Sequence, residues 1–450
     1  MKRFLLALAA IAHISANAQY GWNAVGQGTN FTVQSLAADQ NNHQLYVGGL
    51  FTSAGGNAAV NVARWDGASY SPLGSGVVSG TGVNCLHVIS NGDLIAGGSF
   101  SSIGGITTAN IARWDGLSWN SIGQGLDGSS SIVKCLAMYN NELYAGGLFT
   151  TSGTNTLSNI SKWNGTAWVS VGGGINGVVS ALCVYNGELY AGGNFNNAGG
   201  TNVNNIAKWD GNTWSDVGGG LNYTGTISVS TLQVFIGELY AGGTFNTAGT
   251  TAVHHIAKWD GTSWGDVGGG ASNYTGTISV STFQVFHNEL IVGGNFDTLG
   301  TTRTPYIGKW DGVNWSTLGN GMNNAVFALA AMADTLYAGG WFTQADDTFA
   351  PFIAQWQPEV LFTTGISEVS AAHFGVAPNP ATQRVMVHGN AGDEFSVVLT
   401  DAMGRCVRKA TSANGAVEVL RGDLSAGIYF YRIDVRDKGM IQEGKIIFAD

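Results

Sequence analysis

The chain has 450 residues, of which only 11% are charged, and glycine supplies 68 positions while proline supplies six. This balance excludes a collagen-like chain, and a hydrophobic content of 44% with 14 Trp, 14 Tyr and 20 Phe excludes an intrinsically disordered one. The formal net charge is −10. Because an acidic body repels phosphate backbones and anionic lipid, we expect no nucleic-acid partner.

The N-terminus has the features of an export signal. A basic pair, Lys2-Arg3, precedes an apolar run from Phe4 to Ala12 and a small-residue site at Ala16-Asn17-Ala18. This pattern predicts a secretory signal peptide over residues 1–18. The run is too short to span a bilayer, which takes roughly 20 apolar residues, and we expect no transmembrane segment elsewhere.

Residues 19–356 are dominated by an internal repeat. A Gly-Gly pair recurs seven times, beginning at Gly48, Gly97, Gly146, Gly192, Gly242, Gly293 and Gly339. Each pair is followed at a fixed spacing by a tryptophan, at Trp65, Trp114, Trp163, Trp209, Trp259, Trp310 and Trp356. Each unit contains four strand signals joined by glycine-rich turns, and seven such units predict an all-β, seven-bladed β-propeller.

The two ends of the repeat are out of phase. Residues 21–26 look like a fourth strand without the first three, and residues 352–356 look like a third strand without a fourth. Joining them would complete a mixed last blade and remove exposed sheet edges. Through the segments 143–147 and 189–193 the repeat resembles kelch-like bacterial propellers. This resemblance implies the fold and leaves the function open, since the fold hosts both enzymes and binding proteins.

After a linker at residues 357–372, residues 373–450 form a separate module, which we predict to be a small Ig-like β-sandwich. Three motifs follow in order, containing Pro378, Asn379, Pro380, Asp401, Gly404, Gly427 and Tyr429. They resemble the type A C-terminal sorting domain of the type IX (Por) secretion system. The resemblance implies the secretion machinery as a partner and a secreted or cell-surface location. A generic carbohydrate-binding sandwich is the alternative.

The cysteines indicate no metal site. Cys85 and Cys135 share a column of the repeat that is otherwise occupied by small residues, which favours core filling. A disulfide between them is the alternative, although equivalent positions of adjacent repeats usually lie beyond disulfide reach.

No catalytic, cofactor-binding or metal-binding motif stands out. Basic residues before the tryptophans and acidic residues after them recur in nearly every unit, so we assign them to hairpin turns and packing. The tandem His254-His255 faces opposite sides of a strand and is a poor chelator.

The predicted binding surface is the face that carries the long, unequal loops, because binding residues usually lie on loops held by a rigid scaffold. Its candidates are Tyr223, Tyr274, His255 and Trp341. We expect a monomeric, non-catalytic protein that binds a glycan or a surface protein. The alternative is a secreted polysaccharide-degrading hydrolase or lyase.

Overall fold

The computed structural model describes residues 21–223, 228–273, 276–357, 374–377, 379–389, 394–401, 405–412, 414–435 and 439–449. All regular elements in these ranges are strands, which confirms the all-β class. The chain divides into two compact units, residues 1–360 and 361–450. No helix in the described part is long and apolar enough to cross a membrane. The predicted signal peptide lies outside the described residues.

The first unit contains seven antiparallel sheets of four main strands, which we number in chain order. Sheet 1 consists of β2 (Val33–Asp39), β3 (Gln44–Gly49), β6 (Val62–Trp65) and β7 (Tyr70–Pro72). Sheet 2 consists of β8 (Val77–Val88), β9 (Leu94–Ile103), β11 (Ile111–Trp114) and β12 (Trp119–Ser121). Sheet 3 consists of β13 (Ile132–Tyr139), β14 (Glu142–Leu148), β17 (Ile160–Trp163) and β18 (Trp168–Ser170). In sheet 2 the short β10 (Ile106–Thr107) adds to β9.

Sheets 4 to 7 repeat this order. Sheet 4 consists of β19 (Val178–Tyr185), β20 (Glu188–Asn194), β23 (Ile206–Trp209) and β24 (Trp214–Asp216), and sheet 5 of β26 (Ser228–Phe235), β27 (Glu238–Thr244), β30 (Ile256–Trp259) and β31 (Trp264–Asp266). Sheet 6 consists of β33 (Ser279–Phe286), β34 (Glu289–Asn295), β37 (Ile307–Trp310) and β38 (Trp315–Thr317). Sheet 7 consists of β39 (Val326–Met332), β40 (Thr335–Gly340), β43 (Ile353–Gln357) and β1 (Gly21–Ala24). In most sheets two-residue strands pair between the second and third strands, as β15 (Thr151–Ser152) does with β16 (Asn155–Thr156).

The Gly-Gly pairs allow neighbouring sheets to pack closely. A Cβ atom on Gly146 would lie 2.6 Å from Cγ1 of Val179 in the next sheet, and one on Gly147 would lie 2.0 Å from the carbonyl oxygen of Ile132 in its own sheet. Both distances are shorter than van der Waals contact allows, so these positions require glycine.

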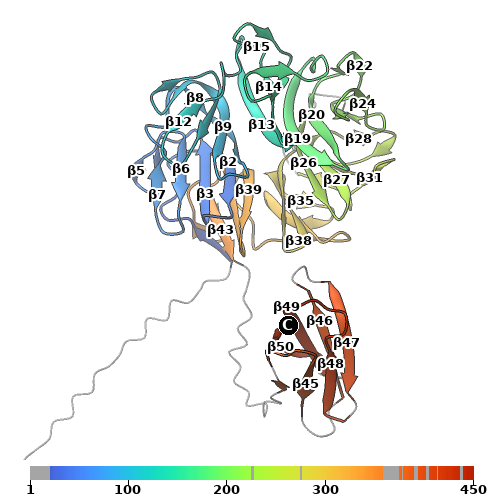
Figure 1. The fold of residues 1–450 in the computed structure, drawn as a ribbon. Helices are drawn as coiled ribbons and strands as arrows, with labels where there is room; N and C mark the ends of the chain where they lie inside the picture. The colour runs from blue at the N-terminus through green and yellow to red at the C-terminus, as the bar shows by residue number, and fades with distance from the viewer. Residues whose placement is uncertain are drawn as a thin grey trace, which may run out of the picture. The chain divides into compact units, whose positions relative to one another are not determined.

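Neighbouring sheets contact each other through their first strands (Figure 1). The order of contact is β2, β8, β13, β19, β26, β33 and β39, and β39 contacts β2 again. An aromatic residue at or near the start of each fourth strand also donates a hydrogen bond to a main-chain carbonyl of the preceding sheet. The donor–acceptor pairs are Tyr70–Val25, Trp119–Leu73, Trp168–Ile122, Trp214–Val171, Trp264–Val217, Trp315–Val267 and Trp22–Leu318.

Sheet 7 joins the two ends of the repeat. Strand β1 pairs antiparallel with β43, with Trp22 opposite Trp356, and the two indole rings lie 5.5 Å apart between centroids. The pairing predicted from the out-of-phase ends is therefore present.

The second unit contains two antiparallel sheets that share one hydrophobic core. One sheet comprises β44 (Gly375–Ala377), β45 (Arg384–His388) and β48 (Ala416–Leu420), and the other comprises β47 (Cys406–Ser412), β46 (Phe395–Thr400), β49 (Gly427–Val435) and β50 (Gly439–Phe448). Val385 and Val387 of the first sheet belong to the same buried cluster as Val397 and Leu399 of the second. Two sheets that enclose one core form a sandwich.

Candidate functional site

The structure brings together two of the four predicted binding residues. Tyr223 is 41% exposed, and its ring centroid lies 6.3 Å from that of His255 at an interplanar angle of 54°. Tyr274, the equivalent residue one sheet further along, lies outside the described residues. Trp341 is 54% exposed and belongs to sheet 7.

His255 lies at a backbone position with a special conformation. The same position has a positive φ in all seven sheets, at Asn61, Asn110, Asn159, Asn205, His255, Tyr306 and Phe352. Asparagine tolerates this left-handed conformation better than most residues. In sheet 4 the Asn205 amide group also donates to the Leu221 carbonyl and accepts from the Phe195 N–H.

The histidine ring cannot reproduce both of those bonds. Nδ1 of His255 is buried and has no hydrogen-bond partner in the described part of the chain. Burial, followed by the neighbouring His254, lowers the pKa of His255, while a hydrogen bond to the backbone of Gly243 opposes the shift. The His255 imidazole is therefore neutral near pH 7. We assign His255 a structural role beside Tyr223.

A hollow of about 420 Å³ lies next to Tyr223 and is lined mostly by amides. Its lining includes Asn222, the residue before Tyr223, and five further asparagines, Asn176, Asn194, Asn196, Asn204 and Asn205. Two of them bond each other, since Nδ2 of Asn176 donates to Oδ1 of Asn196 at 2.6 Å. An amide carries both donors and acceptors, so this lining suits a ligand that has many hydroxyl groups.

Trp341 belongs to a separate aromatic cluster where sheets 7 and 1 meet. The two residues that flank Trp341 are hydrogen-bonded through their backbones to Phe352, since Gly340 N–H donates to the Phe352 carbonyl and Phe352 N–H donates to the Phe342 carbonyl. The Phe352 ring lies 6.0 Å from that of Phe31, which is 45% exposed. Trp341 and Phe31 are thus both exposed apolar residues, and each is connected to the half-buried Phe352.

The repeated charges form ion pairs inside single sheets. In sheets 3 to 6 the lysine before the third-strand tryptophan contacts the glutamate that opens the second strand at 2.8–3.0 Å, in the pairs Lys162–Glu142, Lys208–Glu188, Lys258–Glu238 and Lys309–Glu289. Sequence reasoning assigned the lysines to packing and missed these partners. The constant separation of 20 residues within each pair was the available signal.

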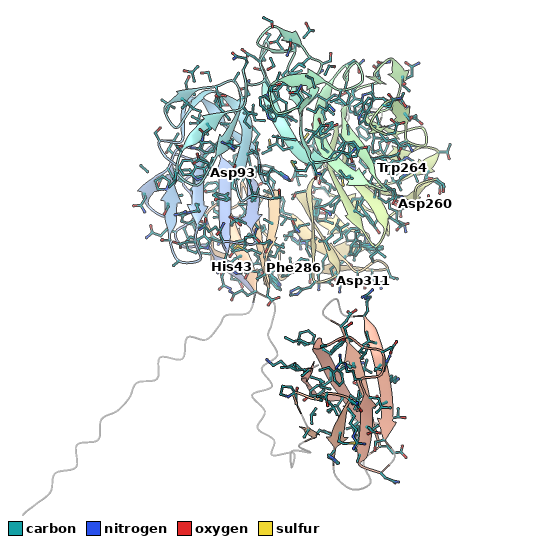
Figure 2. The ribbon with its side chains drawn as sticks, viewed as in Figure 1. His43, Asp93, Asp260, Trp264, Phe286 and Asp311 are labelled. Atoms are coloured by element: carbon teal, nitrogen blue, oxygen red, sulfur yellow. The ribbon has the colours of Figure 1, made fainter. Side chains whose placement is uncertain are left out.

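The repeated aspartates cap hairpin turns, as predicted. Oδ1 of Asp260 accepts the backbone N–H groups of Thr262 and Ser263 at 2.7 and 2.8 Å, and Figure 2 labels this residue together with Trp264, which opens the next strand. In sheet 2 the same two backbone bonds, led by the one from Ser118, lower the pKa of Asp115 to about 2. No group of His, Cys, Asp and Glu side chains in the described residues is arranged to hold a metal ion.

The four cysteines are free thiols, so Cys85 and Cys135 are not bridged. Both are buried in the core, which agrees with the core-filling interpretation.

Several residues of the sorting motif fix the last strand of the second unit. Nδ2 of Asn379 donates to the Lys445 carbonyl at 2.7 Å, and its Oδ1 accepts the Ile447 N–H at 2.8 Å. The Tyr429 hydroxyl donates to the Ser425 carbonyl, and its ring packs edge-on against Phe448.

The structure also describes three other residues of the sorting motif. Asp401 pairs with Arg405 at 2.8 Å, Gly427 opens β49 opposite Phe448, and Pro380 is exposed. Pro378 and Gly404 lie outside the described residues.

The second unit matches a known family. Residues 375–448 match the secretion system C-terminal sorting domain. This confirms the sorting domain predicted from the three motifs, and it marks the chain for export by type IX secretion to the cell surface or the extracellular space. Among curated proteins none matches the sequence.

Solved structures give only remote likenesses. The computationally designed protein Ika8 is 17% identical with a TM-score of 0.42, over 74% of this chain and 98% of its own. The extracellular domain of a hybrid two-component system from B. thetaiotaomicron is 13% identical with a TM-score of 0.48, and the likeness covers 96% of this chain and 60% of that one. PorZ, a surface component of the type IX secretion system of Porphyromonas gingivalis, is 13% identical with a TM-score of 0.32, over 92% and 51% of the two chains. At these scores the likenesses carry no argument about fold or function.

Proposed function

We propose that the first unit is a seven-bladed β-propeller with kelch-like repeats, and that it binds a glycan outside the cell. The cyclic order of contacts between the seven sheets, and the joining of β1 to β43, support the propeller. A cleaved signal peptide at residues 1–18 and a monomeric state belong to the same proposal. The second unit directs the chain to the surface or the medium, where such a ligand would be met.

The observation that carries the glycan proposal is the amide-lined hollow beside Tyr223. Sugars are bound by hydrogen bonds to their hydroxyls and by an aromatic ring stacked on a sugar face. The hollow offers six asparagines as lining, and Tyr223, the residue after the lining Asn222, offers an exposed ring. The described lining holds no carboxylate, whereas glycoside hydrolysis uses a pair of them. We therefore favour binding over the polysaccharide-degrading alternative.

A second candidate is a protein partner that docks on the cluster of Phe31, Trp341 and Phe352. Exposed aromatic side chains gathered on one surface favour this candidate, because such residues often dominate protein interfaces.

The experiment that separates the candidates is a glycan array with the mature chain, residues 19–450, followed by two matched aromatic substitutions. If the glycan lies at the hollow, Tyr223→Ala should weaken binding about fivefold, since a stacked aromatic contact is worth ~1 kcal/mol. Trp341→Ala should leave it unchanged. The reverse result would move the site to the aromatic cluster, and a chain that binds no glycan while it captures a surface protein through Trp341 would replace the first candidate by the second.

A further inference from the structure

The first unit has a larger cleft on the opposite side from the predicted binding surface. The cleft measures about 570 Å³ and lies between sheets 2 and 3. Its lining includes Asn141, in the turn between β13 and β14, and Gly165, in the turn between β17 and β18. These short turns lie on the face opposite the long loops, so nothing in the proposed glycan site accounts for this cleft.

The cleft lies where sheet 2 lacks two aromatic rings that sheets 3, 4 and 5 have. The last residue of the first strand and the third residue of the second strand, which lies two residues before the Gly-Gly pair, form an edge-to-face aromatic pair in sheets 3, 4 and 5. The pairs are Tyr139 and Tyr144, Tyr185 and Tyr190, and Phe235 and Tyr240, with centroids 5.6–5.7 Å apart. In sheet 2 these positions are Ile89 and Ile95, and both line the cleft.

The burial of the third-strand tryptophan in the following sheet differs with the presence of these aromatic rings. The third-strand tryptophans that face complete aromatic pairs are buried, namely Trp209, Trp259 and Trp310. Trp163, which faces Ile89 and Ile95, is only half-buried and forms a wall of the cleft. The two missing rings thus correspond to a space lined by the Trp163 indole, by the aliphatic Ile89 and Ile95, and by several polar residues.

The interface between sheets 6 and 7 provides an internal comparison. There Ile291 replaces the second-strand tyrosine, but the first-strand aromatic residue, Phe286, is retained. The space beside Ile291, Phe286 and Trp356 measures about 270 Å³, less than half the volume between sheets 2 and 3. Of these two spaces, the smaller one is therefore found where one of the two rings is retained.

In other sheets, polar groups at the equivalent positions form hydrogen bonds with tyrosine hydroxyls. The Tyr139 hydroxyl donates to the Gly187 carbonyl at 3.1 Å, and the Tyr185 hydroxyl donates to the Gly237 carbonyl at 3.1 Å. Both acceptors are in the first turn of the following sheet, and Asn141 is the equivalent residue in the cleft. Burial raises the pKa of Tyr144 to about 12, and a hydrogen bond between its hydroxyl and the Trp209 indole opposes that shift. Trp163 is the equivalent indole here.

A cation lies at the same cleft. The Arg113 side chain is 44% exposed and contacts Asp93, labelled in Figure 2, at 3.2 Å through one terminal nitrogen. A guanidinium group has five N–H donors and matches a carboxylate well. Glu142 at the lining is already paired with Lys162 at 2.8 Å, so its charge is balanced within sheet 3.

We propose that this cleft binds a small phenolic acid. The ring occupies the space of the two missing rings, between Ile89, Ile95 and the Trp163 indole. The phenol hydroxyl meets the Asn141 carbonyl and the Trp163 N–H, and the carboxylate meets Arg113. A cleft that is mostly apolar, with a few polar groups that fix orientation, is typical of small-molecule sites.

The test is isothermal titration of the full mature chain with three probes of matched size. 4-Hydroxyphenylacetate should bind saturably. Phenylacetate, which lacks the hydroxyl, should bind about tenfold more weakly, because the site's polar groups are then left unpaired. Tyramine, which carries an ammonium group in place of the carboxylate, should also bind more weakly because Arg113 repels it.

A matched pair of variants locates the site. Ile95→Tyr introduces the residue that five other sheets have at this position, Tyr46, Tyr144, Tyr190, Tyr240 and Tyr337, and should abolish binding by filling the cleft. Ile291→Tyr makes the same change between sheets 6 and 7 and should leave binding unchanged. A third variant, Arg113→Gln, should weaken 4-hydroxyphenylacetate binding about tenfold and remove the preference over tyramine.

The proposal is overturned if 4-hydroxyphenylacetate fails to bind up to about 10 mM, or if Ile95→Tyr and Ile291→Tyr affect binding equally. Circular-dichroism melting of both variants checks that they fold. If Ile95→Tyr does not fold, Arg113→Gln decides the outcome, since unchanged affinity in that variant also overturns the site. Glycan binding at the hollow is measured separately, so failure of one proposal does not affect the other.

Discussion

The indole N–H of Trp22 donates a hydrogen bond to the Leu318 carbonyl at 3.0 Å, across 296 residues of sequence. Trp22 is 1% exposed and pairs in the sheet ladder with Trp356. One residue near the start of the described chain therefore connects sheet 6 to sheet 7 and supplies the outer strand of sheet 7. The stability of the first unit depends on an N-terminal segment of only four strand residues, Gly21–Ala24.

We predict that Trp22→Ala destabilises the first unit by about 3–5 kcal/mol, the usual cost of removing a large buried aromatic side chain. Urea unfolding followed by circular dichroism measures the change. Leu117→Ala is the control, because Leu117 is 89% exposed and should change stability by no more than about 0.5 kcal/mol. Equal effects of the two substitutions would show that β1 contributes little to the unit.

The capped hairpin turns predict a loss of stability in acid. The Asp115 carboxylate accepts backbone N–H groups from Leu117 and Ser118 at 2.9 and 2.8 Å, and these bonds lower its pKa to about 2. An unfolded aspartate has a pKa of about 3.9. Because the folded pKa is the lower one, the contribution is complete above about pH 4 and is lost as the pH falls toward about 2.

The measurement is the urea midpoint between about pH 5 and about pH 2. Asp115→Asn keeps an acceptor oxygen but no longer titrates, so its midpoint should fall less steeply than that of the natural chain. Parallel pH profiles for the two proteins would contradict the assignment.

The free thiols predict selective chemical reactivity. Burial raises the pKa of Cys135 to about 12 and that of Cys183 to about 11, and it also raises that of Cys85. Cys406 is exposed. Because the thiolate is the reactive form, a disulfide reagent at pH 8 should modify Cys406 rapidly and the other three only after denaturation. Rapid modification of Cys85 or Cys135 in the native chain would contradict this.

The bonds made by Asn379 predict a link between the sorting motif and export. Asn379→Ala removes both hydrogen bonds to β50, at about 1 kcal/mol each, and should loosen the end of the second unit. We expect more of the chain to remain in the periplasm, measured by fractionation of a host that has type IX secretion. Asn414→Ala is the control, because the bond that Asn414 makes to the Ser412 hydroxyl uses its backbone N–H.

Much of this protein follows from sequence alone, because its strongest signals are periodic and local. The alternation within each strand, the Gly-Gly pairs and the Asp-Gly turns depend on near neighbours, so they indicate the all-β class and the four-stranded unit. The out-of-phase ends indicated the pairing of Trp22 with Trp356, because only one partner completes an unfinished sheet. Three ordered motifs were enough to predict the sorting domain.

The candidate sites depend on contacts between residues that lie far apart in sequence, which the repeat pattern alone cannot report. The replacement of tyrosine by Ile95 is visible in the sequence, but its consequence is a space beside Trp163, in a different repeat. Asparagine is common in this chain, and only the folding of the separate connections around sheet 4 places six asparagines around one space. The repeat period determines which residues are equivalent along the chain, whereas the packing of neighbouring sheets determines which side chains meet and where a ring is missing.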